Sequence, residues 1–210
     1  MLLILIAITA SYLIGSIPTA YIFCRLLKGI DIRTVGSGNV GATNALRVLG
    51  KRWGILVLLL DILKGFLPVF FLGNFLQPSI TALSNEQLRF IIGLGCISGH
   101  NWTLFLRFRG GKGVATTIGV LIGLAFSIPE LNIVLGFLSL TWFLTFVFTR
   151  IVSISSIIAA ISLPVLAAFL RQSAFIVFAS IVLALFVVVR HKTNIARLLQ
   201  GKEPRLKFKK

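Results

Sequence analysis

Long apolar runs separated by short polar segments dominate this chain. A helix that crosses the hydrocarbon core of a bilayer needs about 20 mainly apolar residues. The first run has no basic start and no Ala-x-Ala cleavage site, so we interpret it as a span and not as a secretory signal. The pattern predicts seven transmembrane helices in an all-α, polytopic membrane protein, at about 2–24, 53–76, 88–106, 113–129, 131–149, 151–170 and 174–190.

Composition agrees with a membrane protein and excludes several other classes. Hydrophobic residues make up 57% of the chain and charged residues 12%, whereas about a quarter of the residues in soluble domains are charged. The mean hydropathy is +1.02. Both cysteines lie in apolar runs, which argues against a disulfide scaffold. With so few carboxylates and histidines we expect no metal site and no cofactor, and we expect residues 1–210 to form a single integral membrane domain.

The basic residues set the expected orientation. Lys and Arg that flank transmembrane helices stay mainly on the cytoplasmic side. With seven spans, eighteen of the twenty-one Lys and Arg fall on one side, in the loops at about 25–52 and 107–112, at Arg150 and in the tail 190–210. This predicts an outside N-terminus and a cytoplasmic C-terminus. The net charge of +16 is then explained by the inner membrane surface and its lipids, so no nucleic-acid partner is expected.

Polar residues inside the predicted spans have two explanations. The pairs Gly95–Gly99 and Gly119–Gly123 are typical of close helix packing. Ionisable groups are costly in hydrocarbon, so Asp61 and Lys64, three residues apart on one helix face, are expected to pair. The pair could bind substrate or support the fold, and both alternatives stay open. For His100 and Asn101 we favour internal hydrogen bonding.

The first cytoplasmic motif, GSGNVGATNALRVLG at 36–50, is typical of a phosphate cradle. Its glycines permit positive φ, so that successive N–H groups can turn toward an anion. Thr43 is expected to cap a short helix that Gly50 ends, with Asn44 and Arg47 on one of its faces. The candidate anion ligands of this motif are Gly36, Ser37, Gly38, Asn39, Gly41, Asn44 and Arg47.

The second and third motifs lie on the same predicted side. RFRGGKGVATT at 107–117 carries Gly110, Gly111, Lys112 and Gly113 into the start of a span, where the helix N-terminus favours an anion. In RHKTNIARLLQGKEPRL, which begins at Arg190, one helix face is expected to hold His191, Asn194 and Arg197. Ser153, Ser155 and Ser156 could add hydroxyl groups on this side or serve packing alone.

Two other functions fit these motifs less well. G-x-G-x-x-G at 36–41 matches a dinucleotide fingerprint, but the fingerprint requires a preceding strand, and here a span precedes it. A transporter of phosphate esters or other small anions remains the alternative function. Transporters often show internal repeats and midplane sites, whereas this chain shows no repeat and has its motifs at one membrane face.

Together the three motifs and the span pattern resemble the bacterial acyl-phosphate glycerol-3-phosphate acyltransferases, the PlsY family. The resemblance covers about Gly15 to Arg205. It implies transfer of a fatty acyl group from acyl phosphate to the 1-hydroxyl of sn-glycerol 3-phosphate, which gives lysophosphatidate and phosphate for phospholipid synthesis. It also implies a multi-pass protein of the bacterial inner membrane whose active site faces the cytoplasm. No oligomer is implied, and a monomer is compatible with the sequence.

The resemblance also assigns roles to residues. Those it implies for catalysis are Ser37, Arg47, Lys112, His191 and Asn194. The glycines Gly110, Gly111 and Gly113 would shape the acyl-phosphate site, and the remaining candidate substrate contacts are Gly36, Gly38, Asn39, Gly41, Asn44, Asp61, Lys64 and Ser153. The basic side chains would offset the repulsion between two phosphates. The proton acceptor is either His191 or a phosphate oxygen of a substrate.

Overall fold

The computed structural model describes residues 1–206, which form helices and connecting turns with no strand among them. The last four residues of the predicted basic tail, 207–210, lie outside this described part. The chain divides into two compact units, Met1–Ile128 and Pro129–Lys210. Within residues 1–206, four helices are long and apolar enough to cross a membrane, and a fifth is added if the bent pair Ala174–Arg190 and Lys192–Leu199 counts as one span.

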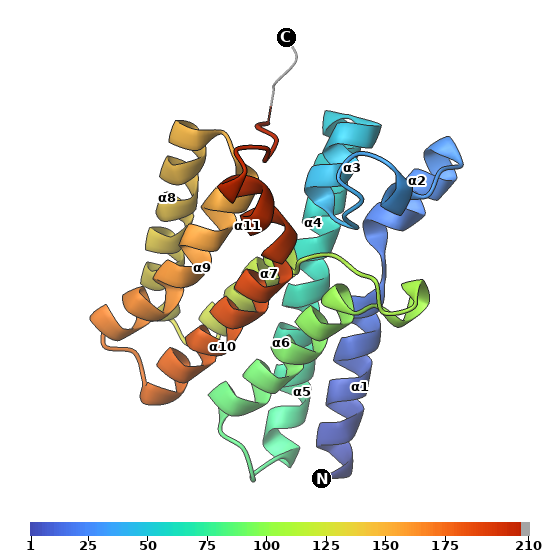
Figure 1. Cartoon of the computed structure of the whole chain (residues 1–210). Coiled ribbons are helices and arrows are strands. Elements are labelled where there is room, and N and C mark those ends of the chain that lie inside the picture. Colours follow the sequence, from blue (N-terminus) through green and yellow to red (C-terminus); the bar gives the residue numbers. More distant parts are fainter. Residues whose placement is uncertain (207–210) are drawn as a thin grey trace. The chain divides into compact units, whose positions relative to one another are not determined.

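Unit 1 contains the first two motifs and most of the polar residues buried within helices. Its main helices pair closely, α1 with α6 and α4 with α7 (Figure 1). Its helical elements are α1 (Leu2–Ser16), α2 (Thr19–Lys28), η1 (Ile32–Thr34), α3 (Ala42–Leu49), α4 (Lys51–Leu67), η2 (Pro68–Leu72), α5 (Gly73–Leu76), η3 (Gln77–Ser79), α6 (Asn85–Asn101), η4 (Leu104–Leu106) and α7 (Val114–Ala125).

The predicted small-residue contacts explain this pairing. A Cβ on Gly95 would lie 2.1 Å from the Ser11 hydroxyl oxygen, and one on Gly99 would lie 2.2 Å from the Tyr12 carbonyl oxygen, so α6 packs directly on α1. A Cβ on Gly119 would likewise lie 2.0 Å from the carbonyl oxygen of Ile62 on α4. Glycine is therefore required where these helix backbones touch, and the packing interpretation is confirmed.

The first predicted span, 2–24, lies within the candidate span Leu2–Lys28, but its helix is interrupted between Ser16 and Thr19. Helix α1 ends at Ser16, Ile17 is extended with φ −56° and ψ 113°, and α2 begins at Thr19. Pro18 causes the break, because its ring disfavours the helical conformation in the residue before it and its nitrogen has no hydrogen to donate. The remaining helix, α2, carries Arg25 and Lys28 in its last turn.

Two further boundaries differ from the prediction. The span predicted at 88–106 is α6, Asn85–Asn101, which starts at a capping box in which Ser84 and Gln87 bond each other's backbone N–H groups. The spacing Ser-x-x-Gln was a readable start signal. The span predicted at 113–129 is the shorter helix α7, which ends at Ala125. Residues 102–113 therefore lie outside both helices and contain only the short helical turn η4.

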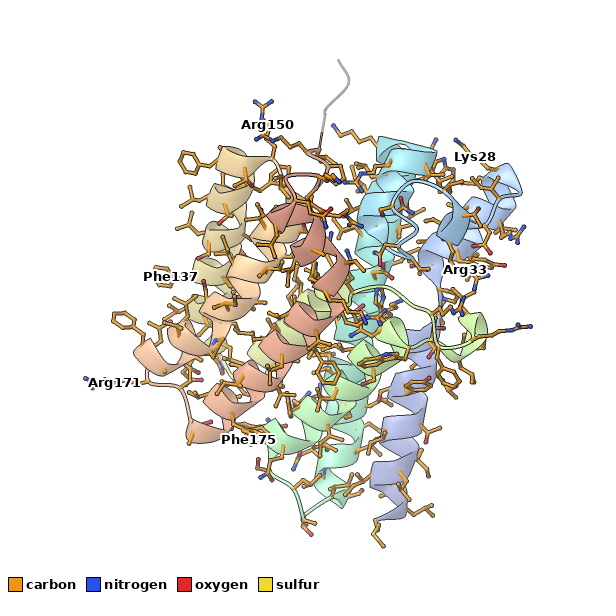
Figure 2. All side chains as sticks on the ribbon, viewed as in Figure 1. Lys28, Arg33, Phe137, Arg150, Arg171 and Phe175 are labelled. Atoms are coloured by element: carbon orange, nitrogen blue, oxygen red, sulfur yellow. The ribbon has the colours of Figure 1, made fainter. Side chains whose placement is uncertain are left out.

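Unit 2 consists of three long helices and a short C-terminal one. Helix α9 (Val152–Phe169) packs on both α8 (Leu131–Thr149) and α10 (Ala174–Arg190), and α11 (Lys192–Leu199) follows α10 at an angle of 61°. Most of α8 is exposed within this unit, and Phe137 points away from it in Figure 2. Arg150 and Arg171 lie at opposite ends of α9 (Figure 2).

Candidate active site

The loop of the first motif is organised by a buried asparagine. Asn44, in the first turn of α3, is 1% exposed, and its Oδ1 accepts a hydrogen bond from the N–H of Ser37 at 2.9 Å. Its Nδ2 donates to the carbonyl oxygens of Ile32 and Val35 at 3.2 and 3.1 Å. Asn44 therefore binds the loop itself, and the N–H of Ser37 points at Asn44 and not at an external anion.

One detail of the first motif differs from expectation, and two agree. Helix α3 begins at Ala42 with Gly41 as its N-cap, so Thr43 is not the cap, while the predicted end at Gly50 is confirmed. Gly36 has φ +62°, and a Cβ there would lie 2.2 Å from Asn44 Oδ1, which explains why only glycine fits. Ser37 and Arg47 are exposed on this loop and helix.

An ion pair stabilises the entry to the same loop. Asp31 caps η1 by accepting the Arg33 N–H, and its carboxylate lies 2.7 Å from Arg33 Nη2. The side-chain hydrogen bond from Arg33 lowers the pKa of Asp31 to about 2. The carboxylate is thus ionised at neutral pH, and this acidic residue of the basic loop is already paired with a cation.

The glycine-rich segment of the second motif folds back on the end of α6. The N–H groups of Gly110 and Gly111 donate to the carbonyl oxygens of Asn101 and His100 at 3.2 and 3.0 Å. Gly113, with φ +75°, is the N-cap of α7. These glycines therefore pack against α6, and half-buried Lys112 is held directly before the α7 N-terminus.

The first and second motifs meet within unit 1. A Cβ on Gly111 would lie 2.6 Å from the carbonyl oxygen of Val40 and 2.2 Å from His100 Nε2. Val40 belongs to the first motif and Gly111 to the second, so segments 71 residues apart in sequence are in contact. The structure thus brings the loop of Ser37 next to the segment that carries Lys112.

Asp61 and Lys64 form the expected ion pair on α4. Lys64 Nζ lies 2.9 Å from Asp61 Oδ1, and the two side chains are 6% and 2% exposed, respectively. Asp61 Oδ1 also accepts from the Thr19 hydroxyl at 2.7 Å, and Lys64 Nζ donates to the Ile17 carbonyl oxygen at 2.8 Å. Buried His100 adds its Nδ1 at 3.7 Å from Asp61 Oδ1, beyond hydrogen-bond length.

A small cavity lies beside this ion pair. It is a shallow hollow of about 180 Å³ that includes open solvent, and its lining includes Ile17, Thr19, Val40, Lys64 and His100. The hollow leaves no enclosed room for a substrate head group.

In unit 2 the third motif begins at the bend between α10 and α11. His191 is 3% exposed, and its Nδ1 lies 2.7 Å from the Val187 carbonyl oxygen. Because a carbonyl oxygen only accepts, this bond places the proton on Nδ1, and Nε2 is then the basic nitrogen of the neutral ring. The ring is thereby oriented by the last turn of α10.

Glu203, which was not predicted from the sequence, joins α9 and α11 in this unit. Its Oε1 accepts from the Ser153 hydroxyl at 2.7 Å and from Asn194 Nδ2, and its Oε2 accepts from Arg197 Nε at 2.7 Å. Burial raises the pKa of Glu203, but the hydrogen bonds from Arg197, Ser153 and Asn194 outweigh it and lower the pKa overall. A single acidic residue in a strongly basic tail was the available sequence signal.

The three serines of α9 are not equivalent. Only Ser153 reaches the Glu203 cluster, which gives it a place beside Asn194. Ser155 and Ser156 instead donate to the carbonyl oxygens of Ile151 and Val152 one turn earlier in their own helix. Each unit by itself thus brings together one group of the predicted residues, Ser37 with the Lys112 segment in unit 1 and Ser153 with Asn194 in unit 2.

Comparison with known proteins gives a uniform result. The family described as glycerol-3-phosphate acyltransferase matches residues 5–201. Among curated proteins, the glycerol-3-phosphate acyltransferase of Endomicrobium trichonymphae is 44% identical over 212 residues, covering 100% of both chains. The one of Fusobacterium nucleatum is 41% identical over 201 residues, covering 96% of this chain and 97% of the relative.

Solved structures agree with the sequence relatives. The glycerol 3-phosphate form of PlsY (YgiH), an integral membrane glycerol 3-phosphate acyltransferase, superposes with a TM-score of 0.84 at 39% identity, covering 97% of this chain and 96% of the other. The lysophosphatidic acid form of PlsY gives a TM-score of 0.81 at 38% identity, covering 97% and 95%. The likeness extends over both units.

Proposed function

Because the chain belongs to the glycerol-3-phosphate acyltransferase family, we propose that it moves a fatty acyl group from acyl phosphate to the 1-hydroxyl of sn-glycerol 3-phosphate. The products are lysophosphatidate and inorganic phosphate. Acyl transfer to glycerol 3-phosphate follows from the family, and the two relatives solved with glycerol 3-phosphate and with lysophosphatidic acid agree with it. The phosphate-activated donor is the part that this proposal adds.

The contact between Val40 and Gly111 is the observation that carries the proposal. It puts an exposed hydroxyl, Ser37, on a loop next to a cation, Lys112, at a helix N-terminus. A helix N-terminus and an ammonium group together favour a phosphate. Arg47 on α3 adds a second cation, so that two phosphates can approach each other with less repulsion.

The acyl transfer needs no covalent enzyme intermediate. The glycerol 1-hydroxyl attacks the carbonyl carbon of the mixed anhydride, the bond from that carbon to the phosphate oxygen breaks, and phosphate leaves with the electron pair. The hydroxyl proton goes to His191 Nε2 or to a phosphate oxygen of a substrate. Asn194 turns its Nδ2 toward Glu203, so its carboxamide oxygen points away from the carboxylate, where it can orient a substrate hydroxyl.

Kinetics of His191→Ala distinguish the two proton acceptors. If His191 is the base, kcat falls by about 10²–10⁴-fold. If a phosphate oxygen accepts the proton, kcat stays near normal and KM for glycerol 3-phosphate rises, because His191 then only positions the substrate.

We further propose that both units form one domain over residues 1–210 with seven spans, an outside N-terminus and a cytoplasmic C-terminus, in the bacterial inner membrane. In unit 2 the Leu206 N–H donates to the Arg150 carbonyl oxygen at 2.8 Å, so the basic tail and Arg150 lie at one end of α9, and Arg171 lies at the other end (Figure 2). This concentration of basic residues at one end supports the proposed orientation. Labelling of single cysteines in sealed right-side-out vesicles tests this. A cysteine at position 171 should react with an impermeant reagent, and one at position 28 should not.

The decisive assay is phosphate release from palmitoyl phosphate by the detergent-purified chain, with and without glycerol 3-phosphate. We expect lysophosphatidate and phosphate in equal amounts only when both substrates are present. Lys112→Ala should reduce kcat by about 10²–10³-fold, as loss of one charged donor to a transition state does. Lys51→Ala, at the exposed start of α4, is the control. Transport of glycerol 3-phosphate into sealed vesicles without donor, and no lysophosphatidate, would instead identify a transporter.

A further inference from the structure

The break between α1 and α2 is held by side chains from two other elements. Lys64 Nζ donates to the Ile17 carbonyl oxygen at 2.8 Å, and the Thr103 hydroxyl donates to the Ser16 carbonyl oxygen at 2.5 Å. Both carbonyls lie where the helical hydrogen-bond pattern is interrupted. The Ile17 carbonyl oxygen also accepts the Thr19 N–H at 3.1 Å, so Lys64 supplies a second hydrogen bond at the break in addition to pairing with Asp61.

His100 lies between the ion pair and the glycine-rich segment. On one side its Nδ1 faces Asp61 Oδ1 at 3.7 Å. On the other side its Nε2 lies where a Cβ of Gly111 would collide, and its carbonyl oxygen accepts the Gly111 N–H. The imidazole therefore connects α4 with the segment 110–113, whose third residue is Lys112.

Direct substrate binding by the ion pair fits the structure poorly. A carboxylate repels the phosphate groups of both substrates, and the Asp61 and Lys64 side chains are only 2% and 6% exposed. The adjoining hollow leaves no enclosed room for a ligand. A buried ion pair also contributes little net stability on average. The main effect of this pair is therefore to position the groups next to it.

We propose that Asp61 and His100 are positioning residues that fix the segment 110–113, and with it Lys112, while Lys64 neutralises Asp61 and holds the helix break at Ile17. The proposal rests on the proposed function only where Lys112 is said to act on substrate. Displacing a catalytic group by about 1 Å can cost about 10²-fold in rate, so a small shift of this segment is sufficient to be measured.

The test uses the charge-balanced double variant Asp61→Asn/Lys64→Met in the full-length chain. Removing both charges avoids an uncompensated buried ion, which a single substitution would create. Two readouts are compared in detergent: hydrogen exchange of the Gly110 and Gly111 amides, and kcat and KM for glycerol 3-phosphate. We expect exchange at least tenfold faster and kcat ten- to a hundredfold lower, with KM changed by less than threefold.

The control is Thr19→Val, which removes one hydrogen bond to Asp61 but leaves Asp61, Lys64 and His100 in place. It should keep exchange and kcat within about twofold of the parent. If the double variant does not elute as a monodisperse species, His100→Gln replaces it, because this substitution keeps a polar end but removes the ring between Asp61 and Gly111. The same changes in exchange and kcat are expected.

The results separate this proposal from the proposed function. If the Gly110 and Gly111 amides of the variant exchange as in the parent, the positioning role is overturned, whatever the kinetics show. If KM also rises strongly, the pair binds substrate directly. Faster exchange with parental kcat overturns the link from the segment to catalysis. If the parent chain makes no lysophosphatidate, the proposed function fails, and the exchange data alone still decide whether Asp61 and His100 hold the segment.

Discussion

Asp61 in unit 1 and Glu203 in unit 2 are both buried carboxylates that accept several hydrogen bonds, but their partners come from different distances along the chain. Asp61 has its cation, Lys64, one turn away on the same helix, and the pair is 2% and 6% exposed. Glu203 follows the last helix and collects Ser153, Asn194 and Arg197, from 50, 9 and 6 residues away. Its cation, Arg197, is 34% exposed.

The sequence separation of their partners gives the two buried carboxylates different structural roles. Both members of the Asp61–Lys64 pair lie on α4. Their remaining polar contacts are with residues of other segments, Ile17, Thr19 and His100. The Glu203 cluster exists only when the tail returns to α9 and α11. The Asp61–Lys64 pair therefore stabilises the segments packed around α4, whereas the Glu203 cluster attaches the C-terminal tail to unit 2. Substitutions should therefore affect the two carboxylates unequally.

The largest expected effect is that of Asp61→Asn on stability. It leaves the Lys64 ammonium buried without a carboxylate, which typically costs about 3–5 kcal/mol of unfolding free energy. Glu203→Gln should cost less, about 1–3 kcal/mol, because the partly exposed Arg197 can turn to water. Denaturation in detergent measures both. Equal losses of unfolding free energy in the two variants would show that burial of the paired cation does not determine the cost.

The second effect concerns glycines. Gly111→Ala should reduce kcat by at least tenfold, because its Cβ would lie 2.2 Å from His100 Nε2 and 2.6 Å from the Val40 carbonyl oxygen. Gly136→Ala in unit 2 is the matched control, since nothing lies within 4 Å of its Cβ position on α8. The control should retain activity and gain about 0.5–1 kcal/mol of stability. Steady-state kinetics and thermal unfolding of both variants test the pair.

The third effect is a dependence of stability on pH. The folded-state pKa of Glu203 is lowered relative to its ordinary value near 4.3. A lowered pKa gives stability that is fully present above the unfolded pKa and is lost as the pH falls through the folded pKa. Stability of unit 2 should therefore decline below about pH 4.3, and Glu203→Gln should remove this part of the decline.

Asp31 in unit 1 provides the comparison for this titration. The hydrogen bond from Arg33 lowers its pKa from 3.8 to about 2, so its contribution is lost between these two pH values. Thermal unfolding of the parent, Glu203→Gln and Asp31→Asn at pH 2–6 measures both groups. A parent that keeps constant stability over this range would contradict the assignment for each.

The smallest expected effect is that of Ser153→Ala. The variant loses one neutral donor to Glu203, and a hydrogen bond to a charged group contributes about 1.5–3 kcal/mol at most. Two donors remain, so we expect the lower end of this range. Ser155→Ala is the control, because its hydroxyl bonds only a carbonyl of its own helix. A larger loss in the control would mean that helix α9, and not the cluster, determines the response.

Local sequence signals predicted much of this structure. The pairing of Asp61 with Lys64, the end of α3 at Gly50 and the close packing at Gly95 and Gly119 are confirmed, because each depends on spacing within one helix or on a residue without a side chain. The break at Pro18 was missed because the surrounding run is apolar on both sides, although the proline itself was a sufficient signal.

Contacts between distant segments could not be predicted in the same way. Asn44 was expected to face an anion, yet it bonds the backbone of its own loop at Ser37, Ile32 and Val35. The convergence of three donors on Glu203 depends on the path of the tail, for which hydrophobic periodicity carries no information. Thr43 does not cap α3, because the helix begins at Ala42 and its N-cap is Gly41, two residues before Thr43.

The shortness of helix α7 in unit 1 has a consequence for access from the lipid. At about 1.5 Å per residue, the 12 residues of α7 extend about 18 Å. This is shorter than the roughly 30 Å of a typical hydrocarbon core. At least one end of α7 should therefore lie at the depth of the hydrocarbon, where irregular backbone is tolerated only inside the protein or beside water. A lipid-soluble acyl donor could then bring its phosphate to Lys112 without first leaving the membrane.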